Sequence, residues 1–369
     1  MTFNGYLESH THSAYSDGVF SDKSFIEKIY HIRQVNRLPL KTIAVTDHDS
    51  LNGYEPLIRC NEEYAADFKA GDPFKILPGI EFTTSFLGTE THILGYFPEF
   101  DGDTFNRILK PLAEQVIEWN EIRMLNGEIY EVILAEQFAV LGIDFDFNLY
   151  QAEEEARKYY HDDCVALDER KSSDHVTWKA NVSRGCMRKA LEKQLGIPEF
   201  GLQTYTIREH SSADHVAVLR DYFLAKCRKN RDQAETIAKD SIGKILYSGG
   251  ETLSPLMAET AVSAIARAGG AAVFAHPGET VLNGISDDSA IAKGLYSILE
   301  LKQYGLSGIE AFYPSHSKYL TERLLNFSRE NDLVICGGSD WHGKSELQHS
   351  RFGQYSPDDS LNRLFEMIY

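Results

Sequence analysis

Histidine and carboxylate side chains recur at the ends of short apolar runs in this chain, and both residue types bind divalent metal ions. Six segments present them: Glu8-Ser-His10-Thr-His12, Ser16-Asp17-Gly18, Thr46-Asp47-His48-Asp49, Gly79-Ile-Glu81 with Thr91-His92, Ala275-His276-Pro277 and Ser339-Asp340-Trp-His342. A single His-x-His pair predicts little, but six such segments where strands are expected to end predict a multinuclear metal site. The nine candidate ligands are His10, His12, Asp17, His48, Glu81, His92, His276, Asp340 and His342.

The spacing and chemistry of these residues indicate a hydrolytic site. His10 and His12, two apart on a strand, point to the same face and can bind one ion together. Glu81 is the candidate bridge between ions, which lie roughly 3.5–4 Å apart in two-metal hydrolases and lower the pKa of a shared water toward about 7. Imidazole and carboxylate suit Zn, Mn or Fe, and a set without thiolate disfavours a structural zinc site. Taken alone, each residue has a structural alternative, such as a turn at Asp17 or a helix cap at Asp47.

The apolar runs that precede these residues are typical of buried strands. They lie at 42–45, 75–77 extending into Ile80, 92–96, 271–275, 308–312 and 333–336. Helical patterns precede several runs, at 24–33, at 256–268 before Gly269-Gly270, and at 317–330. This alternation favours a parallel α/β arrangement, whose functional side chains lie where the strands end.

The middle of the chain has a different composition. Residues 105–250 are rich in Glu, Lys, Arg and Ala, and helical periodicity is expected at 109–138, 184–195 and 212–237. We interpret this block as a helical insertion, a substrate-selecting lid or cap. It divides a catalytic domain formed by residues 1–104 and 251–369.

Composition limits where the protein acts and what it binds. Of 369 residues, 43% are apolar and 25% charged, with no apolar stretch near the ~20 residues that span a bilayer. The first residues lack the features of a signal peptide, and five scattered cysteines without CxxC spacing suit a reducing compartment, so we expect a cytoplasmic protein. The net charge of −18 argues against broad binding to duplex DNA. The positive charge of three divalent ions would exceed the negative charge of the three candidate carboxylate ligands, so the site itself could still bind a small anion.

The ordered motifs resemble those of the PHP (polymerase and histidinol phosphatase) family, especially its stand-alone phosphoesterases with a helical insertion. The resemblance covers about 6–97 and 254–343 and includes Ala275-His276-Pro277 and Ser339-Asp340-Trp-His342-Gly. It implies a distorted (β/α)7 TIM-like barrel with an inserted α-helical subdomain. It also implies three ions, commonly manganese, iron or zinc.

The resemblance assigns the candidate ligands to three ions. One ion would bind His10, His12, Glu81 and Asp340; a second Glu81, His92 and His276; and a third Asp17, His48 and His342. Glu81 and Asp340 are the catalytic residues implied with these ions, and a metal-bridging hydroxide would attack phosphorus.

The chain departs from the family pattern in two places. Glu8 replaces the usual Asp two residues before His-x-His, and we expect it to orient an imidazole. An Arg-Pro-His or Arg-Thr-His element of the insertion is missing; Arg184 or Lys179 could supply the substrate contact, with a solvated helix face as the alternative. His316 could bind the phosphate or act as general acid, with a structural histidine as its alternative and Asp49 as another candidate partner.

These features predict a metal-dependent phosphoric ester hydrolase. The expected substrate is a small phosphorylated metabolite, best matched by a nucleotide such as a 3′,5′-bisphosphate. Alternatives are a short-oligonucleotide 5′–3′ exonuclease, an amide or lactone hydrolase, and a metal-stabilised binding module without turnover. Salt-sensitive affinity that grows with strand length would distinguish the exonuclease from a mononucleotide phosphatase.

Overall fold

The computed structural model describes residues 2, 4–16, 18–20, 22–68, 73–125, 253–343 and 346–368. By its internal contacts the chain divides into two compact units, Met1–Val116 with Leu253–Tyr369, and Ile117–Thr252. Asp17, Lys179, Arg184 and the helices expected at 184–195 and 212–237 lie outside the described residues. The elements described below belong to the first unit, except that the helix beginning at Lys110 continues past Val116 to Leu125.

A seven-stranded sheet runs through this unit in the order β1-β2-β3-β4-β5-β6-β7. Its strands are β1 (Leu7–Thr11), β2 (Thr42–Val45), β3 (Lys75–Phe86), β4 (Thr89–Tyr96), β5 (Ala271–Phe274), β6 (Leu306–Phe312) and β7 (Val334–Gly337). The pairs β1–β2, β2–β3, β5–β6 and β6–β7 are parallel. The strand positions expected from the apolar runs are therefore confirmed.

The expectation of a parallel arrangement is wrong for β4, which is antiparallel to both β3 and β5. The reason is the two-residue connection between β3 and β4. Leu87 has φ 53° and Gly88 has φ 75°, the left-handed conformations of the tight turn that closes an antiparallel hairpin. A parallel pair would need a much longer crossover connection.

Helices follow most strands. The described helices are α1 (Asp22–Val35), α2 (Tyr54–Phe68), α3 (Gly102–Thr104), η1 (Phe105–Leu109), α4 (Lys110–Leu125), α11 (Ala258–Arg267), α12 (Asp288–Glu300), η3 (Leu301–Tyr304), α13 (Lys318–Glu330), α14 (Glu346–Arg351) and α15 (Ser360–Ile368). The expected helices at 24–33, 256–268 and 317–330 are α1, α11 and α13, and α4 falls within the one expected at 109–138. Among the described residues, no helix is both long enough and apolar enough to cross a membrane.

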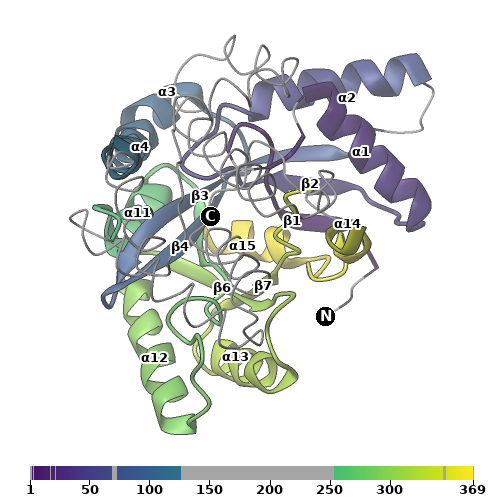
Figure 1. Cartoon of the computed structure of the whole chain (residues 1–369). Helices are drawn as coiled ribbons and strands as arrows, with labels where there is room; N and C mark the ends of the chain where they lie inside the picture. Colours follow the sequence, from purple (N-terminus) through teal and green to yellow (C-terminus); the bar gives the residue numbers. More distant parts are fainter. Residues whose placement is uncertain are drawn as a thin grey trace, which may run out of the picture. The chain divides into compact units, whose positions relative to one another are not determined.

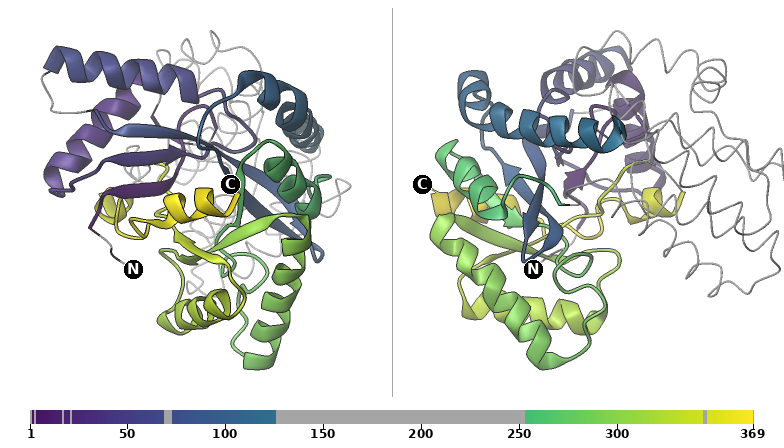
Figure 2. Two further views of the ribbon diagram at one scale, coloured as in Figure 1. Left: turned by 180° about the vertical axis from the view of Figure 1, so that it is seen from behind. Right: turned by 60° about the vertical axis from the view of Figure 1, so that its left-hand side comes forward.

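Helices α1 and α2 lie side by side next to the first strands of the sheet (Figure 1). The buried face of α1 includes Phe25, Ile26 and Ile29, whose spacing of three and four residues forms one apolar stripe. These side chains pack with Ile43 of β2 and with Trp341 beyond β7. Figure 2 gives two further views of the same helices and sheet.

The sheet curls around a second apolar cluster. Tyr96, Ala271 and Val273 of the central strands share this cluster with Leu7 of β1 and with residues of the C-terminal helix α15. Beyond their ends, β1 and β7 also approach one another: the N–H of His12 donates to Trp341 O at 2.8 Å, and the N–H of Trp341 to His10 O at 3.1 Å. The protein therefore has a mixed α/β fold with a curled seven-stranded sheet.

The close approach of the two edge strands requires a glycine. A Cβ atom at Gly338 would lie 2.2 Å from Cβ of His10, a distance that real side chains do not tolerate. The segment after β7 can therefore pack against Cβ of His10 only because Gly338 has no side chain. This contact brings Asp340 and His342 to the end of the sheet where β1 ends.

Candidate metal centre

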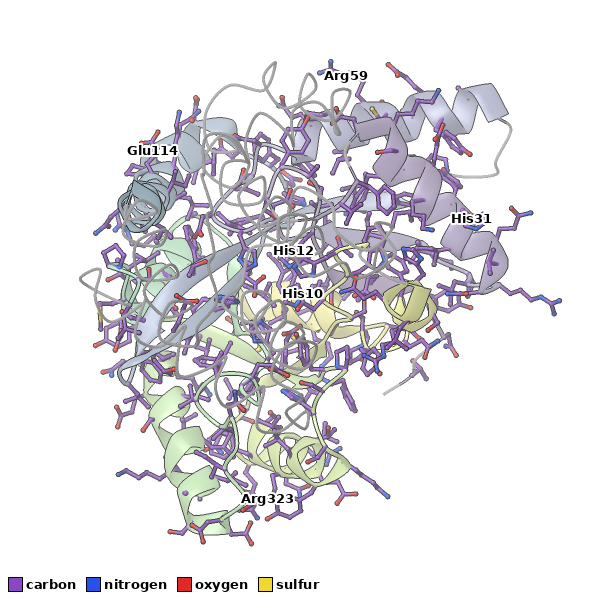
Figure 3. The ribbon with its side chains drawn as sticks, in the orientation of Figure 1. His10, His12, His31, Arg59, Glu114 and Arg323 are labelled. Carbon is purple, nitrogen blue, oxygen red and sulfur yellow. The ribbon has the colours of Figure 1, made fainter. Side chains whose placement is uncertain are left out.

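Strand ends gather the candidate ligands at one end of the sheet. His10 lies in β1 and His12 just beyond it, and His48, His276 and the pair Asp340 and His342 follow β2, β5 and β7. In Figure 3, His10 and His12 lie amid the strands, whereas His31 and Arg323 project from helices at the periphery.

The hairpin adds Glu81 and His92 to this group. Glu81 lies in β3, and His92 lies in the first half of β4, where it pairs with Thr83. Because β4 runs antiparallel, its beginning lies beside the end of β3. The chain after β2 also returns to β3, since the N–H of Glu81 donates to Asp47 O and the N–H of Asp49 donates to Glu81 O. His48 is thereby held beside Glu81.

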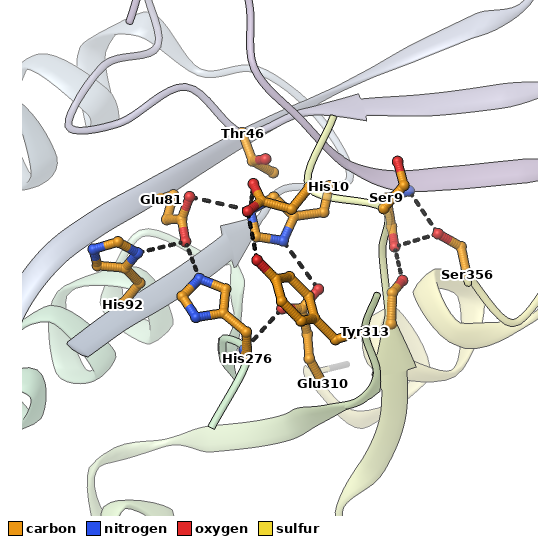
Figure 4. Close-up of polar contacts among 12 residues, drawn as sticks. Ser9, His10, Thr46, Glu81, His92, His276, Glu310, Tyr313 and Ser356 are labelled. Carbon is orange, nitrogen blue, oxygen red and sulfur yellow. Dashed lines mark hydrogen bonds and ion pairs between the residues drawn. The ribbon is translucent and has the colours of Figure 1, made fainter. Parts of the chain in front are cut away.

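Glu81 is the centre of the cluster, because five imidazoles surround its buried carboxylate. Oε1 lies 3.0 Å from His92 Nδ1 and 3.0 Å from His276 Nε2 (Figure 4). Oε2 lies 3.1 Å from Nε2 of both His10 and His12, and 3.6 Å from His48 Nε2. A buried carboxylate does not need five imidazole partners to satisfy its hydrogen bonds. Imidazole and carboxylate together form the set of ligands that Zn, Mn and Fe favour.

Asp340 forms the opposite side of the cluster. Its Oδ1 lies 3.1 Å from His12 Nε2, 3.4 Å from His10 Nε2 and 3.5 Å from His342 Nδ1. Its Oδ2 accepts a hydrogen bond of 2.7 Å from the phenol of Tyr313. One carboxylate oxygen thus faces the histidines, and the other is held in place by Tyr313.

The ligand atoms form three groups, each with all its donor atoms within 4.8 Å of one another. The groups are His10, His12, Glu81 and Asp340; His48, Glu81 and His92; and His12, His48 and His342. The first is the set expected for one ion. The second group contains His48 where His276 was expected, although His276 also contacts Glu81. The third group contains His48 and His342 as expected, together with His12. Asp17, also expected there, lies outside the described residues.

The electrostatics of the cluster suit cations. Burial alone would raise the pKa of Glu81, but His10, His48 and His92 hold it well below its usual value. Burial alone would lower the pKa of His92, but Glu81 raises it to about 9. The buried Nδ1 of His92 lies 3.0 Å from Oε1 of Glu81 but is not aligned for a hydrogen bond to it. The raised pKa of His92 favours its protonated form beside Glu81, and a bound cation would replace such a proton.

The backbone at the cluster is strained. Asp340 has φ 50°, Asp49 φ 50° and His276 φ 21°, in a region that residues other than glycine rarely adopt. Such conformations persist where the surrounding structure enforces them and they are common at functional sites. Here each belongs to a segment that carries a candidate ligand.

Glu8 does not orient an imidazole, so this sequence-based expectation is wrong. Its buried carboxylate accepts backbone N–H groups of His10, Ser339 and Gly353, at 3.2, 3.1 and 2.7 Å. Glu8 is one of the residues that tie β1 to the segments after β7. Its partners are three backbone N–H groups and the hydroxyl of Ser356, so Glu8 holds the backbone of these segments together.

Glu310 of β6 makes the contact that was expected of Glu8. It is fully buried, and its Oε1 lies 3.0 Å from Nδ1 of His10. Sequence reasoning missed this residue, although one signal was present: Gly308-Ile309-Glu310 repeats the tripeptide Gly-Ile-Glu81, and it places a carboxylate within an apolar strand.

Both ring nitrogens of His316 are engaged by the backbone. Nδ1 lies 3.1 Å from Ala311 O, and Nε2 accepts a hydrogen bond of 3.1 Å from the N–H of Gly278. Burial lowers the pKa of His316, which favours this neutral tautomer with its proton on Nδ1. The geometry supports the structural alternative for His316 and leaves no proton on Nε2 for a leaving group.

Comparisons with known proteins agree with the resemblance that the motifs indicate. No family model matches the chain. Over 88 residues it is 39% identical to phosphoribosyl 1,2-cyclic phosphate 1,2-diphosphodiesterase of Eggerthella lenta, a match spanning 24% of this chain and 29% of that relative. The matching stretch is thus similar to part of a phosphodiesterase, which agrees with the type of protein that the motifs predict, and the chain spans less than a third of the length of that relative.

Two solved structures share the fold. A protein from Bifidobacterium adolescentis assigned as a metal-dependent phosphoesterase matches with a TM-score of 0.51 and 17% identity, over 97% of this chain and 94% of its own. An amidohydrolase from Chromobacterium violaceum, determined with bound sulfate and no metal, matches with a TM-score of 0.51 and 19% identity, over 91% of this chain and 87% of its own. At these identities the likeness concerns the fold.

Proposed function

We propose that this protein is a metal-dependent phosphoester hydrolase of the PHP type. The observation that carries the proposal is the buried carboxylate of Glu81 within 3.0–3.6 Å of five imidazoles, with Asp340 opposite. The partial match to a phosphodiesterase and the fold shared with a metal-dependent phosphoesterase support the same chemistry.

The proposed ligand set is the nine residues expected from the sequence, Asp17 included, holding three divalent ions of Mn, Fe or Zn. Such ions activate water near neutral pH and neutralise the charge that develops on phosphoryl oxygens. Glu81 would bridge two ions, and Asp340 would hold a ligand oxygen in the orientation fixed by Tyr313. The curled sheet would form the distorted barrel, and residues 105–250 the insertion that selects the substrate. Cytoplasmic location stays a prediction.

The proposed substrate is a small phosphorylated metabolite, in first place a nucleotide such as a 3′,5′-bisphosphate, with Arg184 or Lys179 contacting its phosphate. A short oligonucleotide cleaved as by an exonuclease is the alternative from the sequence. A cyclic phosphodiester joins these candidates because the partially matching relative is named for one. Amide hydrolysis is favoured by one observation, the fold shared with an amidohydrolase.

The test is product release by manganese-loaded protein from a matched panel of substrates. The panel holds a 3′,5′-bisphosphate, a 5′-monophosphate, a cyclic phosphate, histidinol phosphate and a 5′-phosphorylated oligonucleotide, with His10→Ala as control. Products are resolved by chromatography, so that ring opening and strand cleavage are seen as well as free phosphate. Turnover of one class that His10→Ala abolishes supports the proposal; metal binding without turnover of any member refutes it.

Replacement of His316 by Ala separates its two candidate roles. Because both nitrogens bind backbone groups, we expect a loss of stability of about 1–3 kcal/mol and unchanged metal content. Thermal unfolding and metal analysis measure both. A general acid would show, in addition to this loss of stability, a fall in the turnover of the folded protein of about 10²–10⁴-fold that is largest for poor leaving groups, whereas a purely structural His316 would leave that turnover close to the wild type.

A further inference from the structure

Glu310 contacts two candidate metal ligands at once, although it belongs to none of the three ligand groups. Oε1 lies 3.0 Å from Nδ1 of His10, and Oε2 accepts a 2.9 Å hydrogen bond from the backbone N–H of His276 (Figure 4). His10 and Glu310 are both fully buried. The carboxylate thus joins β6 to the segments that carry two different ligands.

The two partners impose a strict requirement on this side chain. The backbone N–H of His276 is always a donor. Nδ1 of His10 must also be a donor whenever Nε2, the nitrogen that faces Glu81 and Asp340, is to act as a metal ligand. Both oxygens at position 310 must therefore accept, and among side chains of this length only an ionised Glu offers two acceptors.

We propose that Glu310 is a positioning residue that fixes the tautomer of His10 and the place of His276, and so couples the sites of two ions. The inference rests on the proposed metal centre but not on the substrate. Carboxylates that accept from the distal nitrogen of a metal-binding histidine typically contribute about 10–100-fold to metal affinity. Glu310 would act on two ligands together.

Glu310→Gln is the discriminating variant, because Gln has the same shape and only one acceptor. If its oxygen faces the N–H of His276, its NH₂ faces His10 and favours the tautomer with the proton on Nε2, which blocks the metal. If the amide is reversed, its NH₂ meets the N–H of His276, and two donors face each other. We expect Zn²⁺ affinity to fall by about 10–100-fold and the visible spectrum of the Co²⁺-loaded protein to change.

Glu8→Gln is the matched control. Glu8 is also fully buried, but its oxygens accept from backbone N–H groups and from Ser356 Oγ. We expect Glu8→Gln to lower the unfolding temperature measured in EDTA and to keep the proton on Nδ1 of His10, because no oxygen of Glu8 contacts an imidazole. A purely structural Glu310 would behave in the same way.

A measurement on the wild-type protein covers the case in which Glu310→Gln does not fold. In the Zn²⁺-loaded protein, NMR with ¹⁵N-labelled histidine should give a protected, downfield Nδ1–H proton for His10 and a metal-bound Nε2. A proton on Nε2 of His10, or wild-type Zn²⁺ affinity with an unchanged Co²⁺ spectrum in Glu310→Gln, would overturn the inference. Failure of every phosphoester in the panel would instead refute the proposed function and leave this inference standing.

Discussion

Glu81→Gln is expected to abolish hydrolysis and to remove most of the bound metal. Gln keeps the shape of the side chain but loses the charge and one of the two acceptor oxygens that face the five histidines. Metal ions supply several kcal/mol of charge stabilisation to the transition state, so their loss corresponds to roughly a thousandfold or more in turnover. Metal analysis after gel filtration and the rate with the best substrate of the panel measure both effects.

The control for Glu81→Gln is Glu99→Gln, which makes the same chemical change at an exposed position beyond β4. It should keep the metal content and rate of the wild type. Unaltered metal content in Glu81→Gln would contradict the bridging role. Full metal content with lost turnover would place Glu81 in the reaction but not in metal binding.

Stability of the metal-free protein is expected to fall between about pH 6.5 and pH 9. The pKa of His92 is about 9 in the folded protein, because Glu81 raises it against the effect of burial, and about 6.5 in an unfolded chain. The protonated histidine therefore stabilises the fold fully below pH 6.5, and this contribution is lost as the pH rises through 9. For His92 alone the change amounts to at most about 3 kcal/mol, measurable by urea unfolding in EDTA.

Metal binding should show the opposite dependence, because each ion must displace protons from the histidines. Apparent affinity for Mn²⁺ is expected to rise across the same pH window in which the metal-free protein loses stability. In His92→Gln the loss of stability between pH 6.5 and pH 9 should become smaller. An equally steep loss in this variant would show that His92 is not the group responsible.

The sequence determined the features that depend on neighbouring residues. Apolar runs located the strands, because each buries a few consecutive side chains, and the ligands that end them were recognisable by type and position. The direction of β4 was not predictable in this way, because Leu87 is a residue type that rarely adopts the left-handed conformation that its tight hairpin turn requires.

Only the tertiary structure decided which side chains meet. His10 contacts Glu310 across 300 residues of sequence, and Glu8 contacts Gly353 across 345. No local pattern encodes such pairs, because they depend on the curl of the sheet and on the packing of Gly338 against Cβ of His10. The sequence by itself therefore determined the chemical type of the site, and the fold decided that Glu310 orients the histidine while Glu8 holds the backbone.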